Sequence, residues 1–321
     1  MKNHKYKHKY IKYKQKYLNM IGGNSLRLLT YNVFSGLDEK YSKERRSETV
    51  KLILELNLDI ICLQEATTDF INELNSDKRY HIYSKQESLN VDEKEIVESS
   101  GYLAILSKFE IKEKILLYKG GYYDDGILKV ILNTQDFLGF DLCIYNVHLS
   151  GGTYDKPVDV ILTKRIRRML ELDILNQDLR NSEDKCQCII MGDFNSDANS
   201  IESFPNNPYK FDEKELHVFP EVRFYPSRQV ENIKDMWSNL RPNDPGFTED
   251  TEKNSFRKYL KKNQKRQARY DQVYYKKCIE IQPKTISLVG TESIGKQDDV
   301  ILFPSDHFGV FCEFTIIKKI N

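Results

Sequence analysis

Polar side chains that could carry out chemistry stand at the ends of apolar, strand-like runs of the sequence. Four short motifs hold most of them: Thr30-Tyr31-Asn32, Leu63-Gln64-Glu65, Gly192-Asp193-Phe194-Asn195 and Ser305-Asp306-His307. His148, after another such run, and Asp271, within Tyr270-Asp271-Gln272-Val273, belong with them. Rigid strands hold side chains steadily at their ends, where ligands can reach them. Each motif alone has an ordinary explanation, such as a turn or a helix N-terminus, but their joint occurrence indicates one active site.

The acidic members of this set favour a hard divalent cation. Glu65, Asp193 and Asp306 are carboxylates, and their companions are amides and imidazoles rather than thiolates. Oxygen-rich sites suit Mg²⁺ better than Zn²⁺, and Mn²⁺ is an alternative. We therefore expect Mg²⁺ as the cofactor.

The neutral and basic members suit a phosphate group. Asn32 and Asn195 can hydrogen-bond phosphate oxygens without adding negative charge. His307, if paired with Asp271, can be held as an imidazolium that stabilises the charge developing on phosphorus. Asp193 can orient and deprotonate water, a general-base contribution of about 10²–10⁴-fold. Together these groups predict metal-assisted hydrolysis of a phosphodiester. The sequence carries no serine or cysteine elbow, P-loop or dinucleotide fingerprint that competes with this interpretation.

The elements that must position these residues are short apolar strands that alternate with amphipathic helices. Helices are expected at 42–56, 66–74 and 158–179. Strands are expected at 26–33, 58–63, 102–107, 111–118, 127–133, 141–148, 187–191, 270–275, 278–288 and 310–317. This order predicts an α/β fold with two packed mixed, largely antiparallel β-sheets flanked by helices, a four-layer α-β-β-α sandwich. We expect residues 24–321 to form this single catalytic domain, with 253–269 as a basic loop.

The ordered set of motifs resembles the endonuclease/exonuclease/phosphatase superfamily, and within it the magnesium-dependent tyrosyl-DNA phosphodiesterase 2 branch. Segments 101–106, 235–237, 247–254 and 304–309 add to this resemblance, which runs over residues 26–314. It implies a two-sheet sandwich, in agreement with the strand pattern. It also implies hydrolysis of the bond between a topoisomerase tyrosine and a DNA 5′-phosphate.

The resemblance implies a role for each residue of the set. Glu65 would ligate Mg²⁺, with Asp306 near the ion or holding its water, and Asp193 would position the attacking water. Asn32, Asn195 and His307 would contact the scissile phosphate. Asp271 would orient His307, and His148 would face the same phosphate.

Two positions depart from the pattern of this branch. An acid usually stands two residues after the first asparagine and helps to hold the metal, but here that position is Phe34, and Asp38 is the nearest acid. The branch's His-Leu-Glu-Ser-Thr stretch is here His148-Leu149-Ser150-Gly151-Gly152. The metal shell and this loop are therefore expected to differ from those of the branch.

The charge balance conceals two basic segments. Lys and Arg number 49 against 48 Asp and Glu among the 321 residues. Segment 253–269 carries eight basic residues and no acid, with Phe256 and Tyr259 placed to stack on bases. Its basic residues are Lys253, Arg257, Lys258, Lys261, Lys262, Lys265, Arg266 and Arg269. Because a basic segment beside the site suits a polyanion, we expect DNA as the partner, with a covalent 5′-tyrosyl or protein adduct as one form of it.

Segment 1–17 carries seven lysines and no acid, and residues 1–23 are expected to be flexible or an amphipathic helix. No apolar core follows the lysines, so a secretory signal is not predicted, and its Tyr/Lys pattern resembles leaders of large DNA-virus proteins. Five of the six cysteines lie in apolar runs, which favours reduced thiols and an intracellular compartment, nucleus or cytoplasm. We expect a monomer without membrane insertion.

Several other functions remain open on the sequence alone. An abasic-site endonuclease or a ribonuclease of the same fold is one alternative, and a small-molecule or lipid phosphodiesterase is another. A nucleic-acid-binding protein without catalytic activity is the alternative of a different class. Binding alone does not require the cluster of Glu65, Asp193, Asn195, Asp306 and His307, so the sequence favours an enzyme.

Overall fold

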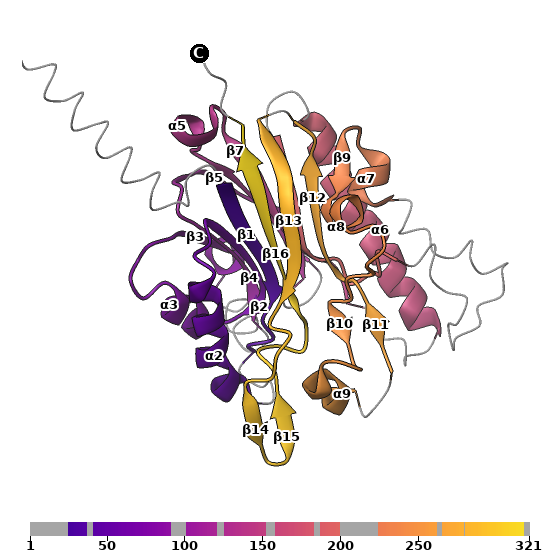
Figure 1. Cartoon of the computed structure of the whole chain (residues 1–321). Helices are drawn as coiled ribbons and strands as arrows, with labels where there is room; N and C mark the ends of the chain where they lie inside the picture. The colour runs from indigo at the N-terminus through magenta and orange to yellow at the C-terminus, as the bar shows by residue number, and fades with distance from the viewer. Residues whose placement is uncertain are drawn as a thin grey trace, which may run out of the picture.

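The structure, a computed structural model, describes residues 25–36, 41–90, 101–120, 125–151, 158–182, 187–199, 224–261, 265–278 and 280–317. The basic leader 1–23, Asp38, Cys186 and Lys262 lie outside the described residues. Within these ranges the chain forms two six-stranded sheets packed face to face (Figure 1).

The first sheet has the strand order β13–β16–β1–β2–β4–β3. Its strands are β13 (Ile281–Val289), β16 (Gly309–Ile316), β1 (Ser25–Asn32), β2 (Ile60–Ala66), β4 (Tyr102–Ser107) and β3 (His81–Ser84). Only β1 and β2 run parallel in this sheet, and the other pairs are antiparallel.

The second sheet has the order β5–β6–β7–β8–β12–β9. Its strands are β5 (Ile111–Tyr118), β6 (Gly126–Leu132), β7 (Leu142–His148), β8 (Gln187–Asp193), β12 (Asp271–Lys276) and β9 (Ile233–Asp235). Here β7 and β8 form the parallel pair, and the other pairs are antiparallel.

Helices cover the outer face of each sheet. Helices α2 (Ser42–Glu55) and α3 (Thr68–Leu74) pack on the first sheet, and α6 (Val158–Asn181) packs on the second (Figure 1). Strand β1 shows why the strands are nearly continuous apolar runs: Leu26 and Leu28 face the second sheet, whereas Leu29 and Tyr31 face the helices. The predicted α-β-β-α sandwich is confirmed.

Shorter elements complete the fold, and most of them were not predicted because they span too few residues to show a period. They are the 3₁₀ helix Lys85–Ser88, α5 (Gln135–Leu138), α7 (Pro226–Gln229), α8 (Met236–Leu240), α9 (Ser255–Leu260) and the hairpins β10 (Glu249–Asp250)–β11 (Gln267–Ala268) and β14 (Gly295–Gln297)–β15 (Val300–Leu302). Segment 253–269, predicted as a loop, thus contains helix α9 and strand β11. The side chain of Asn254 caps α9 by accepting a hydrogen bond of 2.9 Å from the Arg257 amide.

The five described cysteines are free thiols, and four of them are buried. Among the described residues, no helix has the length and apolar character needed to cross a membrane.

Candidate active site

The predicted site residues gather at one end of the sandwich because the inward-facing positions of the strands change from apolar to polar there. On β7 the inward residues run from Leu142 and Ile144 to Asn146 and His148. Register then aligns the strand ends: His148 pairs with Asp193 across β7 and β8, and Asp193 pairs with Asp271 across β8 and β12. His148, Asp193 and Asp271 therefore lie side by side at one end of the second sheet.

Asp193 lies at the centre of this group. Its Oδ2 accepts a hydrogen bond of 3.1 Å from Asn32 Nδ2, which also donates to Glu65 Oε1 at 2.7 Å. His148 Nε2 lies 3.6 Å from Asp193 Oδ2 and 3.8 Å from Glu65 Oε1. Asn32 comes from the first sheet and Asp193 from the second, so this amide joins the two halves of the site.

His307 and Asp271 form a buried pair beside Asp193. The Nδ1 atom of His307 lies 2.8 Å from Asp271 Oδ2 and 4.0 Å from Asp193 Oδ2. Burial alone would lower the pKa of His307, but the negative charges of Asp271, Asp193 and Asp306 raise it to about 10. The imidazole is therefore a cation at neutral pH, a group that can stabilise negative charge on a phosphate.

Asn195 is held by backbone geometry. Its φ of 48° lies in the left-handed region that asparagine tolerates, and its backbone N–H donates to Asp193 Oδ1 at 2.8 Å. Its Nδ2 donates to the carbonyl of Leu149 at 2.9 Å. The loop that follows His148 thus fixes the orientation of the Asn195 side chain next to Asp193.

Glu65 is aimed into the site by an irregularity in β2. The register between β2 and β4 shifts between Leu63 and Ala66, and Glu65 has a φ of 54°. A β-bulge of this kind re-aims a side chain beside an active site, at a cost of about 1–3 kcal/mol for the strained residue. The backbone of Glu65 packs directly against Gly101. Any residue with a Cβ at position 101 would clash, because that Cβ would lie 2.4 Å from the Glu65 carbonyl carbon.

Asp306 has a partner that sequence reasoning missed. Arg257 on α9 forms an ion pair with Asp306 Oδ2, and its Nε bonds Glu249 Oε1 at 2.6 Å. Burial would raise the pKa of Asp306, but the charges of Arg257 and His307 hold it below its usual range. Burial likewise opposes the charge of Arg257, but Asp306 and Glu249 raise the pKa of its guanidinium. The run of basic residues in 253–269 indicated that a basic side chain lies near Asp306. It did not indicate which of the eight turns inward.

Phe34 occupies the position at which the branch that the sequence resembles usually carries an acid. The guanidinium of Arg45, from α2, lies over the rings of Phe34 and Phe256, with its Cζ 5.1 and 4.9 Å from their centroids. Such cation–π contacts hold the start of α9 against the end of β1. The expected difference in this part of the site is thus a stack of Arg45 on two aromatic rings.

The basic residues of 253–269 divide into buried and exposed sets. Arg269 is buried and pairs with Asp235 at 2.8 Å, and Arg266 Nη1 lies 3.5 Å from Glu249. Phe256 is fully buried, so of the two aromatics only Tyr259, 41% exposed, can reach a base. The exposed cations are Lys253, Lys258 and Lys265, with Lys261 half-buried.

The donor set at this end of the sandwich fits a divalent cation at Glu65. Its carboxylate keeps 18% of its side-chain surface exposed and is adjacent to Asn32 and Asp193, whose side chains offer further oxygens. Three ligand atoms of Asp193, Asp271 and His307 also lie within 4.8 Å of one another. In that trio His307 is an imidazolium whose Nδ1 lies against Asp271 Oδ2, so it has no lone pair to offer a metal ion, and Glu65 is the better place for one.

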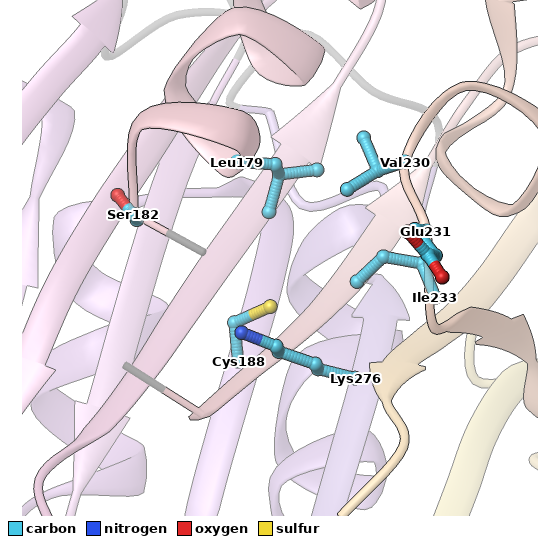
Figure 2. A pocket seen from close by; sticks show the side chains of 7 residues that line it. All are labelled: Leu179, Ser182, Cys188, Val230, Glu231, Ile233 and Lys276. Atoms are coloured by element: carbon cyan, nitrogen blue, oxygen red, sulfur yellow. The ribbon is translucent and has the colours of Figure 1, made fainter. Parts of the chain in front are cut away.

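The hollow drawn in Figure 2 lies away from this site. Its lining includes Cys188 at the start of β8 and Lys276 at the end of β12, the opposite ends of those strands from Asp193 and Asp271. Leu179, Val230 and Ile233 close its apolar side. It therefore has no part in the catalytic group.

Comparison with known proteins places this geometry in a family. The model of the Endonuclease/Exonuclease/phosphatase family matches residues 29–307. The chain is 25% identical over 303 residues to tyrosyl-DNA phosphodiesterase 2 of Gallus gallus, a match that covers 92% of this chain and 68% of that protein. The protein of the same name from Homo sapiens is 23% identical over 303 residues, covering 92% and 69%.

A solved structure shares the fold. The crystal structure of D. rerio tyrosyl-DNA phosphodiesterase 2 complexed with single strand DNA product superimposes with a TM-score of 0.63 and 18% identity, covering 91% of this chain and 99% of that one. The chain belongs to the Endonuclease/Exonuclease/phosphatase family. Within that family it is like the tyrosyl-DNA phosphodiesterase 2 branch, and the prediction of a hydrolase that cleaves phosphodiester bonds is confirmed.

Proposed function

We propose that this chain is a Mg²⁺-dependent phosphodiesterase that acts on DNA ends and hydrolyses 5′-tyrosyl-DNA links by in-line attack of water. The observation that carries the proposal is the position of Asp193, whose carboxylate is bonded to Asn32 and lies within 4.0 Å of both His148 and His307. A base surrounded by phosphate-binding groups is the arrangement that water attack on phosphorus needs.

Each residue has a task in that reaction. Asp193 orients the water and accepts its proton, a contribution of about 10²–10⁴-fold. Asn32 and Asn195 hydrogen-bond the nonbridging phosphate oxygens, and His148 faces the same group. The His307 cation, held by Asp271, stabilises the negative charge that grows on those oxygens.

Glu65 would hold the Mg²⁺, and Asp306, paired with Arg257, would lie near the ion or hold its water. When bound, the ion neutralises negative charge on the phosphate and on the departing oxygen. Mg²⁺ keeps several waters and needs few protein carboxylates, so the replacement of the expected acid by Phe34 is compatible with this assignment.

The DNA substrate is supported by exposed side chains on and beside α9. Exposed Lys258 and Tyr259 lie on α9, and exposed Lys253 and Lys265 lie before and after it in the chain. This combination of cations and an aromatic ring suits a single-stranded backbone with a stacked base. The 5′-tyrosyl specificity is supported by the likeness to the tyrosyl-DNA phosphodiesterase 2 proteins of Gallus gallus and Homo sapiens.

The test offers one enzyme preparation four oligonucleotides: a 5′-tyrosyl, a 3′-tyrosyl, an abasic and an unmodified strand. Each is incubated with Mg²⁺, with Mn²⁺ and with EDTA, and the products are resolved by mass. We expect release of tyrosine from the 5′ adduct alone, and none in EDTA. Tyrosine released only from the 3′ adduct, or incision only at the abasic site, would defeat the proposed specificity.

Asp193→Asn tests the role of the base, because it keeps the shape of the side chain and removes the carboxylate. We expect turnover to fall by at least about 10²-fold while DNA binding persists. Equal turnover in the variant and the wild type, independent of metal, would show that Asp193 is not the base and would refute the mechanism.

A further inference from the structure

A buried polar bridge joins the two sheets directly beneath the catalytic residues. Asn146 on β7 donates from Nδ2 to the carbonyls of Leu63 and Ala104, each at 2.8 Å, and its Oδ1 accepts from Gln64 Nε2 at 2.7 Å. Gln64 Nε2 also donates to Thr30 Oγ1 at 3.0 Å. Asn146, Gln64 and Thr30 have no exposed surface.

The three partners of Asn146 belong to the first sheet, whereas Asn146 belongs to the second. Two carbonyls face Nδ2 and one amide faces Oδ1, so the orientation of the Asn146 amide is fixed by its surroundings. Asn146 therefore connects β7 to both β2 and β4 by hydrogen bonds that have one favourable geometry.

The bridge lies at the bulge that aims Glu65. Leu63 and Ala104 face each other in the last regular pair of β2 and β4 before the register shifts. Since the ladder is disrupted at a bulge, an amide that donates to the carbonyls on both strands holds the bulge in place. The bulge in turn lets the consecutive residues Gln64 and Glu65 both face inward.

Every polar side chain of the bridge stands next to a catalytic residue on its own strand. Asn146 is two residues before His148 and Thr30 two before Asn32, which places each pair on one face of its strand. Gln64 directly precedes Glu65. The first sheet carries Asn32 and Glu65, and the second carries His148 and Asp193, so the site is correct only when the two sheets keep one relative position.

Apolar packing alone does not fix that position closely. The hydrophobic contacts between the sheets are non-directional, whereas the hydrogen bonds of a buried amide are directional. Two of the groups that Asn146 bonds are backbone carbonyls, which no substitution can remove, so its amide both satisfies them and sets where they lie.

We propose that Asn146 is a positioning residue, which locks the two sheets and the β2 bulge together so that the catalytic side chains meet. This rests on the proposed function only in that turnover is one of its readouts. Asn146 does not touch the reacting atoms, and it acts through Glu65, Asn32 and His148.

The test compares Asn146→Ala with Ile144→Ala. Ile144 is two residues earlier on the same face of β7, is equally buried and packs in the same interface, so it reports loosening of the core alone. For Asn146→Ala we expect kcat to fall by about 10²-fold with KM nearly unchanged, because a displacement of about 1 Å costs that much. For Ile144→Ala we expect a lower melting temperature and a kcat close to that of the wild type.

Gln64→Ala and the double variant with Asn146→Ala complete a cycle. If the bridge acts as one unit, the double variant loses no more kcat than the worse single variant. Asn146→Ser, which keeps one donor, is expected to be intermediate, and it replaces the alanine variant if that variant does not fold. Wild-type kcat in Asn146→Ala, or an equal loss in Ile144→Ala, would overturn the proposal.

Hydrogen exchange measured by mass spectrometry gives a readout without turnover. We expect faster amide exchange in β2 and β4 of Asn146→Ala than of Ile144→Ala, at matched distance from the melting temperature. If the wild type hydrolyses none of the phosphodiesters offered, the proposed function fails, while the exchange comparison still decides the role of Asn146. Equal exchange in the two variants would then refute it.

Discussion

His307 and Asp271 meet across the junction of the two sheets, with His307 Nδ1 2.8 Å from Asp271 Oδ2. His307 lies just before β16 of the first sheet, and Asp271 is the first residue of β12 in the second. The carboxylate therefore does two things: it keeps the imidazole charged, and it fixes where that charge lies.

Asp271→Asn is expected to lower kcat by about 10²-fold at pH 8 and by less at pH 6. In the wild type the pKa of His307 is raised to about 10, so the imidazolium is present below about pH 10 and is lost above it. Without the Asp271 carboxylate the pKa of His307 falls toward about 6.5. The imidazolium is then mostly present at pH 6 and mostly lost at pH 8. The measurement is kcat against pH, with Asp299→Asn on the exposed turn of β14–β15 as the control. A loss of equal size at pH 6 and pH 8 would contradict a role for the imidazolium charge.

Glu65→Gln is expected to raise the Mg²⁺ concentration that gives half-maximal activity by at least about tenfold. The substitution keeps the length of the side chain but removes the negative charge that a hard cation needs. Calorimetric titration with Mn²⁺ gives the affinity without turnover. Glu73→Gln, on the exposed face of α3, should change neither quantity. An unchanged metal requirement in Glu65→Gln would place the ion elsewhere.

Replacing the exposed lysines Lys253, Lys258 and Lys265 by alanine is expected to weaken single-stranded DNA binding and to flatten its salt dependence. For each phosphate that is no longer neutralised, the slope of log K against log salt should fall by about 0.7 in magnitude. Lys51→Ala on α2, whose side chain is 65% exposed, is the control for a charge outside the basic segment. A slope that stays at the wild-type value would show that the DNA does not follow α9.

Asp59 should impose a pH-dependent cost on folding. Burial raises the pKa of this carboxyl to about 6, even though Lys108 and the Arg27 amide favour its charged form. Because its pKa in the unfolded chain is about 3.9, the cost is absent below about pH 4, grows up to about pH 6 and is constant above, at about 3 kcal/mol. The free energy of unfolding in urea, measured for the wild type and Asp59→Asn, should diverge over this range in favour of the variant. Parallel curves would contradict the raised pKa.

The strands and the long helices could be predicted because the strands are short apolar runs and the helices are amphipathic. Strand 102–107 and strand 111–118 were predicted with the boundaries that β4 and β5 have. The helix expected from Ala66 starts instead at Thr68, because Thr67 caps it by accepting a hydrogen bond from Phe70 and β2 extends to Ala66.

The site was predictable to the extent that its residues stand at the ends of such strands. The pairings were not, because they depend on distances between remote segments: Arg257 with Asp306, Arg45 with Phe34, and Asn146 with the bulge at Glu65. A run of like charges also hid the fact that Arg257 and Arg269 turn inward to meet Asp306 and Asp235. Their charge predicts that arginine and lysine side chains lie on the surface. Only the packing shows which of them are buried.

The position of β16 in the first sheet determines how late in synthesis that sheet can be completed. It is the last described strand of the chain, yet it lies between β13 and β1, and β1 is the first described strand. During synthesis β1 therefore has an open edge until residues 309–316 leave the ribosome, and pairings of such large sequence separation form slowly. His307 arrives with the same segment, so, with the role proposed for it, cleavage of a phosphodiester has to wait for the last strand of the first sheet.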